Sequence, residues 1–322
     1  MKQLIVFCLC APIVYAQGTT VGAGYYPPAP VVVSPGQIIT FFTTVGAVSE
    51  KVEAGNPPLP ASLAGFSATL EQGTATIPAP VLSVFPFNPC LSAVMETCLS
   101  ITGITVQIPF ELRANIPGNL APTLITALRI TGPSGDRIAG ASILLQPQLD
   151  AIHVMHQQDT VLAADQAQPV SASPAVVTHG NGKVVDASNP ARTGEELVMY
   201  AVGLGATTTL VKTGAASPSP AVPVSACCSL RFDYTPNAPP SPGLIINTGD
   251  PPPPPAPLFA GLTPGFVGLY QINFLVPAPP PGINPCNVSS GLEFNPFAVV
   301  RSNLTVTLIG RVSFDGAGLC VE

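Results

Sequence analysis

The 322-residue chain has no tryptophan and few charged side chains, and both shortages limit what it can bind. Charged residues make up 9%, against about 25% in an average soluble domain. Lys and Arg number only 11, and the net charge is −6, so nucleic acid is not an expected partner. The same shortage argues against electrostatic binding to anionic membranes. Without Trp, a sugar-binding platform would have to be built from Tyr and Phe.

Groups from which a catalytic site could be built are also scarce. The sequence contains no GxSxG nucleophile elbow, no P-loop and no dinucleotide-binding fingerprint. Its densest acidic pair, Glu195 and Glu196, consists of neighbours in a predicted strand. Their side chains should point to opposite faces and could not act together as general acid and base. We therefore expect no catalytic residues, no cofactor and no enzymatic activity.

Of the three histidines, His153 and His156 offer an alternative interpretation. Asp150 and Asp159 flank them, and if residues 149–162 formed a helical turn, both imidazoles could share a face and bind a metal. The glutamate of an HExxH motif is absent, however. We expect a polar linker with two surface histidines and no metal site. A metal-dependent hydrolase at these residues is the least favoured function.

The N-terminal residues have the features of a secretory signal peptide. Lys2 is followed by an apolar stretch at 4–14, too short to span a bilayer, and small residues precede a cleavage point near Ala16. No later apolar stretch is long and unbroken enough to be a membrane anchor. The sequence thus predicts a secreted or cell-surface protein without a transmembrane segment, with residues 1–16 removed.

Six cysteines follow this leader, an even number that suggests disulfides in an exported chain. We expect one pair within a short local loop and a second pair between Cys227 or Cys228 and a later cysteine. The candidates for disulfide bonds are Cys90 with Cys98 in the local loop, then Cys227, Cys228, Cys286 and Cys320.

Short runs of β-branched and aromatic residues, bounded by Gly, Pro or Asn, predict many short strands. Proline is abundant, with 40 residues, which disfavours long helices. Strands at this spacing are typical of a sandwich or barrel. Strands are expected at 37–44, 63–71, 80–85, 101–109, 123–131 and 138–146. The organisation is predicted as a Pro-rich lead-in at 17–30, a first domain at 31–150, a linker at 151–178, and a second domain at 179–322 with a Pro-rich insertion at about 234–257.

Three ordered matches between the halves predict an internal duplication. Residues 36–42 parallel 194–200, residues 79–82 parallel 256–259, and residues 102–109 parallel 270–277. In the last of these segments, apolar and polar residues alternate, which predicts one buried and one more exposed strand face.

Two long motifs carry a resemblance to a known family. NPARTGEELVMYAVGLG at 189–205 and LFAGLTPGFVGLYQINFLVP at 258–277 resemble the Solibacter-type C-terminal domain, an uncharacterised module of exported acidobacterial proteins, over about 178–310. A weaker copy over about 30–146 rests on SPGQIITFF and ITVQIPFEL. The resemblance implies an all-β fold of two tandem immunoglobulin-like β-sandwich domains, with no established catalytic residues.

The residues of this signature have structural explanations. Glycines in it suit positive φ or bulges, the Pro-Gly pair suits a type II turn, and the aromatic residues suit the core. The signature residues are Gly194, Gly203, Gly205, Pro264, Gly265, Tyr270, Asn273 and Pro277.

These features favour a secreted, non-enzymatic binding or adhesion module. Its expected partner is a polysaccharide or a cell-surface protein, held by loops at the ends of the sandwiches. A structural component of the envelope or matrix is the alternative. The sequence gives no indication of the oligomeric state.

Overall fold

The computed structural model of the protein describes most of both predicted domains. The predicted signal peptide, the Cys90–Cys98 pair, Cys227 and most of the lead-in and of the Pro-rich insertion lie outside the described residues. The described residues are 20–22, 31–43, 46–87, 101–116, 124–133, 137–157, 159, 174–226, 228–236, 256–286 and 302–322.

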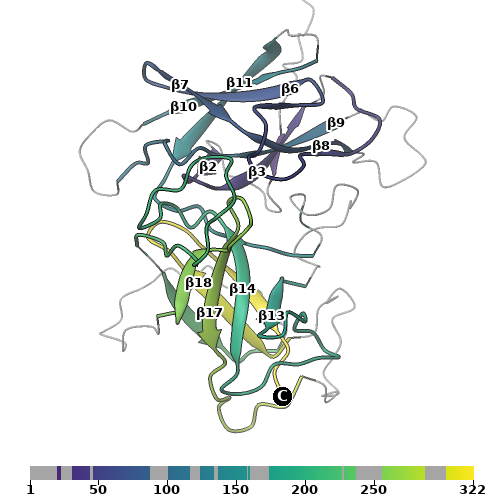
Figure 1. The fold of residues 1–322 in the computed structure, drawn as a ribbon. Coiled ribbons are helices and arrows are strands. Elements are labelled where there is room, and N and C mark those ends of the chain that lie inside the picture. The colour runs from purple at the N-terminus through teal and green to yellow at the C-terminus, as the bar shows by residue number, and fades with distance from the viewer. Residues whose placement is uncertain are drawn as a thin grey trace, which may run out of the picture.

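Every regular element in the described residues is a β-strand, which confirms the all-β prediction (Figure 1). No described segment forms a helix long and apolar enough to span a membrane. The first half contributes β1 (Thr20–Gly22), β2 (Val31–Val33), β3 (Ile38–Thr43), β4 (Val52–Glu53), β5 (Ser62–Leu63), β6 (Phe66–Gln72), β7 (Ala75–Ala79), β8 (Val81–Phe87), β9 (Ile101–Gln107), β10 (Thr126–Thr131) and β11 (Arg137–Pro147). The second half contributes β12 (His153–Val154), β13 (Val177–His179), β14 (Glu196–Val202), β15 (Ser229–Asp233), β16 (Phe259–Leu262), β17 (Tyr270–Leu275), β18 (Leu304–Ile309) and β19 (Phe314–Leu319).

Two sheets enclose the core of the first half. One has the strand order β1-β3-β9-β8-β4, and the other has the order β2-β11-β10-β6-β5 with β7 against β6. The core joins Phe41 and Ile104 of one sheet to Leu70 and Leu128 of the other. In β6 and β10 every second residue is buried, so each gives one face to this core. All six predicted strand regions contain an observed strand.

The second half is built in the same way from a five-stranded and a three-stranded sheet. Their orders are β12-β14-β17-β16, with β13 against β14, and β15-β18-β19. In β17, Tyr270, Ile272 and Phe274 are buried in the core while Gln271 and Asn273 are half-exposed. The alternation predicted for this strand is therefore confirmed.

The two halves repeat one strand order. Strands β3, β9 and β8 are neighbours in the first half as β14, β17 and β16 are in the second, and these strands carry the three sequence matches. In the other sheet, β11-β10-β6 corresponds to β19-β18-β15. The register agrees, because Ile38 faces Gln107 and Glu196 faces Leu275 at equivalent ends of the paired strands. The repeat predicted from three short matches thus extends to both sheets.

A buried contact joins the halves, which lie one above the other in Figure 1. Ile38 of β3 packs with Met155 and Val202 in a separate apolar cluster. Beside it, the N–H of Gly214 donates a 2.6 Å hydrogen bond to the buried side-chain oxygen of Gln107. The second half covers the outer face of β3 and β9 at the Ile38 end, and at the other end Phe42 packs against Phe85 of the first half. Both strands are therefore buried almost continuously along their length. The contact holds the halves in one relative orientation.

The cysteine pairing expected from the sequence is wrong for the second half. Cys286 and Cys320 form a disulfide with each other, with Cα atoms 5.2 Å apart, so neither is available to Cys227 or Cys228. The pairing follows from the backbone, because the N–H of Cys286 donates to the carbonyl of Val321 and holds the two segments side by side. Cys228 is also disulfide-bonded, with its partner outside the described residues.

Candidate functional site

The segment that leaves the first half becomes an edge strand of the second. Gly203 and Gly205 have φ values of 81° and 85°, as the sequence predicts for these signature glycines. A Cβ on either would overlap the carbonyl oxygen of Ala151 or of Leu149, so only glycine lets this segment pass so closely. His153 then faces Val202 across the β12–β14 pair. The helical turn that was one alternative for 149–162 is absent from the described residues of this region, 149–157 and 159.

A carboxylate anchors the same segment to the opposite sheet. Asp150, which is buried, accepts hydrogen bonds from the backbone N–H groups of Arg311 (2.6 Å) and Ser313 (2.8 Å), and from the Ser313 hydroxyl. The N–H of Ile152 donates to that hydroxyl in turn. Asp150 therefore caps the turn between β18 and β19 and does not join the histidines, beside which the sequence had placed it.

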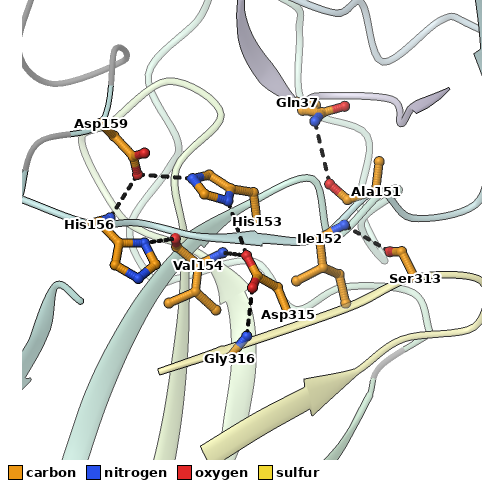
Figure 2. A network of polar contacts seen from close by, with 10 residues as sticks. All are labelled: Gln37, Ala151, Ile152, His153, Val154, His156, Asp159, Ser313, Asp315 and Gly316. Carbon is orange, nitrogen blue, oxygen red and sulfur yellow. Dashed lines mark hydrogen bonds and ion pairs between the residues drawn. The ribbon is translucent and has the colours of Figure 1, made fainter. Parts of the chain in front are cut away.

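His153 lies between two carboxylates (Figure 2). Its Nδ1 is 3.0 Å from Oδ2 of Asp315, and its Nε2 is 3.0 Å from Oδ2 of Asp159. Asp315 is itself fixed, because it accepts hydrogen bonds from the N–H groups of Val154 and Gly316. The side chain of His153 is only 3% exposed, so the prediction of a surface histidine is wrong for this residue. The reason is that residues 153–154 pair into a sheet.

This arrangement sets the charge of His153. Burial works against the charged imidazolium, but the hydrogen bonds to Asp159 and Asp315 outweigh it and raise the pKa of His153 to about 9. With both ring nitrogens facing carboxylates, the imidazolium is the form that satisfies both. His153 and its two partners therefore form a buried charged group that ties three segments together.

His156 has a different environment at the rim of the cluster. Its Nδ1 lies 2.9 Å from the carbonyl oxygen of Val154, so this nitrogen is the protonated one and donates. The ring is half-exposed and its centroid is 6.0 Å from that of His153. Burial lowers the pKa of His156, which keeps the ring neutral. A neutral imidazole retains a lone pair that can bind a cation.

Asp159 is the fully buried member of the cluster. Its Oδ2 accepts the backbone N–H of His156 at 2.7 Å and faces His153, while Oδ1 has no hydrogen-bond partner among the described residues. One donor atom from each of these three residues lies within 4.8 Å of the other two. The sequence identified all three, but it did not identify Asp315, which lies 162 positions from His153. No local spacing signals such a contact.

A second histidine–carboxylate pair stabilises the 189–205 motif. Nδ1 of His179 lies 2.6 Å from Glu195, whose other oxygen accepts the N–H of Arg192. Glu196 points away and accepts a hydrogen bond from Asn273 on the neighbouring strand. The two glutamates thus serve different faces, as the sequence predicts. Their contacts maintain the turn and the strand pairing.

The Pro-Gly pair of the second motif forms the expected turn. The N–H of Phe266 donates to the carbonyl of Thr263, and Gly265 at the third position has a φ of 83°, as a type II turn after Pro264 requires. Phe266 is exposed, whereas Val267 packs beside the cluster that joins the halves. The loop therefore contributes to the contact between the halves.

The remaining signature residues also have structural roles. Gly194 has a φ of 78° in the turn before β14. The hydroxyl of the buried Tyr270 donates a 2.6 Å hydrogen bond to the carbonyl of Gly205, and the carbonyl of Pro277 accepts one from the hydroxyl of Tyr234. These contacts maintain the fold, which is the role that the sequence predicts for the signature.

Comparisons with protein-family models, with curated proteins and with solved structures found no match to this chain. The resemblance of its two long motifs to the Solibacter-type domain therefore stays a prediction.

Proposed function

We propose that this chain is a secreted, non-enzymatic binding or adhesion protein made of two immunoglobulin-like modules of the Solibacter-type. The observation that carries the proposal is the repeated architecture held in one orientation by the buried contact around Ile38 and Gln107. Sandwich modules bind through their loops and outer surfaces. A fixed pair of modules holds two such surfaces at a constant spacing, which suits recognition of an extended partner.

An exposed apolar group on the first half favours a cell-surface protein as that partner. Leu144 of β11 faces Ala127 of β10, and Ile125 directly precedes β10. Ile125 and Leu144 are 59% and 53% exposed. Clustered exposed apolar side chains are typical of protein-binding surfaces. These side chains are aliphatic, whereas a sugar-binding surface stacks rings against aromatic groups.

A retention assay tests the proposal. The full chain, with its disulfides formed, is incubated with envelope fractions of the source cells and with insoluble polysaccharides. We expect saturable retention on the envelope that falls at least about tenfold, equivalent to 1.4 kcal/mol, when Ile125→Lys and Leu144→Lys are combined. Leu210→Lys is the matched control, because Leu210 is 82% exposed in the other half.

Each outcome decides a different part of the proposal. Retention on a polysaccharide alone would replace the expected class of partner. If all variants were retained on the envelope equally well, the surface at Ile125 and Leu144 would not be the binding surface. Absence of retention on every material would contradict a binding function.

A further inference from the structure

A fully buried carboxylate lies beside His153. Asp159 is fully buried, and its Oδ1 has no partner among the described residues. A carboxylate oxygen removed from water without a partner is unfavourable, and such groups in native proteins mark strain or an unfilled ligand position. Here the oxygen belongs to a group of residues that could all bind a cation.

We propose that His153, His156 and Asp159 bind one divalent transition-metal ion, Zn²⁺ or a similar ion. One donor atom from each of the three residues lies within 4.8 Å of the other two. Two imidazole nitrogens and a carboxylate oxygen form a ligand set that zinc and its neighbours in the first transition row accept. Calcium and magnesium prefer sites made of oxygen atoms.

Two of the three ligand atoms are already at the separation that one ion requires. Bonds from Zn²⁺ to nitrogen or oxygen are about 2.0–2.2 Å, so two ligands of one ion lie about 3–3.5 Å apart. Nε2 of His153 and Oδ2 of Asp159 are already 3.0 Å apart. His156 must rearrange to join them, because its Nδ1 donates to the carbonyl oxygen of Val154; its ring lies at the rim of the cluster, where it can turn.

The surroundings of His153 match those of a zinc-binding imidazole. Histidines that bind metals usually donate their other N–H to a carboxylate, which orients the ring and raises its basicity. Asp315 stands in that place at Nδ1, and backbone N–H groups of Val154 and Gly316 hold it there (Figure 2). An incoming metal ion would displace the proton from Nε2, while Nδ1–H stays donated to Asp315, and Nε2 would then offer its lone pair to the ion beside Asp159.

The burial of the cluster points to a structural ion. His153 and Asp159 are inaccessible to a substrate, since their side chains are 3% and 0% exposed. An ion here would link β12 to Asp159 within the second half, next to the contact between the halves. The inference is independent of the proposed function, because the ion would stabilise the fold whichever partner the protein binds.

Metal titration of the full chain tests this site. The chain is purified without reductant so that its cysteines stay paired, stripped with EDTA, dialysed, and titrated with ZnCl₂ by calorimetry. A parallel titration with Co²⁺ is followed by absorption, in which the visible bands report the coordination geometry and the lack of a thiolate band excludes cysteine ligands. We expect one ion per chain, a raised Tm in its presence, and much weaker binding of Ca²⁺ and Mg²⁺.

Three variants assign the ion to the cluster. His156→Gln should retain the fold, since this ring lies at the rim, and should weaken Zn²⁺ binding by more than about 100-fold. Asp315→Asn should weaken it about 10–100-fold, as changes beside a ligand do. His179→Gln removes the third histidine of the chain, away from the cluster, and should leave binding unchanged.

The proposal is overturned if the wild-type chain takes up no Zn²⁺, or if His156→Gln and His179→Gln bind it equally well. In the first case the cluster is a buried ion pair only. If Asp315→Asn fails to fold, as circular dichroism would reveal, the comparison of His156→Gln with His179→Gln decides alone.

Discussion

Gln37 and Glu195 close the same turn in the two halves of the chain. The side-chain oxygen of Gln37 accepts a 2.9 Å hydrogen bond from the N–H of Ser34, and that of Glu195 accepts a 3.0 Å bond from the N–H of Arg192. Gln37 is buried beside the second half, whereas Glu195 is part-exposed and meets His179. A neutral amide can be buried at the contact, while a carboxylate needs water or a charged partner.

The turn at Glu195 should make stability depend on pH. Partial burial acts to raise the pKa of Glu195, but hydrogen bonds from His179 and the N–H of Arg192 lower it below the usual value of about 4.5. A lowered folded-state pKa adds stability that is present above 4.5 and is lost as pH falls through the folded value. Glu195→Gln should therefore cost about 1 kcal/mol near neutral pH.

Urea unfolding at a series of pH values from neutral to acid checks this expectation. The difference between Glu195→Gln and the wild type should shrink steadily below the unfolded-state pKa. Glu53→Gln is the control, because Glu53 is 64% exposed and its ion pair with Lys51 should contribute little. A difference that stays constant with pH would contradict the assigned cause.

Gly203 should be much less tolerant of substitution than Gly194. Both have positive φ, which costs a residue with a Cβ about 1–2 kcal/mol. At Gly203 the added methyl group would also overlap the carbonyl of Ala151, whereas nothing lies within 4 Å at Gly194. Gly203→Ala should therefore lower the free energy of unfolding by at least about 2 kcal/mol more than Gly194→Ala. Equal losses in urea unfolding would show that the segment at 149–151 is not held this closely.

A charge placed at the contact should separate the halves, whereas the reverse change at the equivalent position of the second half should not. Ile38 is buried at the contact, and Glu196 occupies the equivalent position on an exposed face. Ile38→Glu would bury an unpaired charge and should cost about 3–5 kcal/mol, with a larger radius of gyration in X-ray scattering. Glu196→Ile should leave the radius unchanged. An Ile38→Glu variant as compact and stable as the wild type would argue against a tight contact.

The disulfide should contribute strongly to the second half. Cys286 and Cys320 are 34 positions apart. A crosslink that closes a loop of this length lowers the conformational entropy of the unfolded chain, which stabilises the folded state by about 3–4 kcal/mol. The double substitution of both residues by Ser should lower the unfolding free energy by that amount while keeping the folded structure. Peptide mapping without reduction should recover the two segments joined. Recovery of Cys286 linked to Cys227 or Cys228 would contradict this pairing.

The strands and the repeat could be predicted because their signals are local. Residues 37–44 and 101–109 are rich in β-branched and aromatic residues between turn residues, and they form strands. The alternation around Ile272 could be read in the same way. Positive φ at Gly203 and Gly205 followed from the preference of glycine for such backbone.

The features that sequence reasoning missed depend on contacts between distant residues. His153 looked like part of a polar linker, because nothing near it indicates pairing with Val202 or a contact with Asp315. The choice of Cys286 as partner for Cys320 also depends on where the backbone brings two segments together. Composition and periodicity describe neighbours along the chain and give no information on contacts between residues that are far apart in the sequence.

The position of β19 in the chain has a consequence for biosynthesis. Asp150 accepts its hydrogen bonds from residues 311–313, His153 meets Asp315, and Ala191 pairs with Val321. The described strand pairs of the first half, in contrast, all lie within 20–147. Since domains fold in order as the chain emerges, the first half can fold early, while the second must wait until residues 302–322 have been made. Two copies of one architecture thus differ in when each can fold.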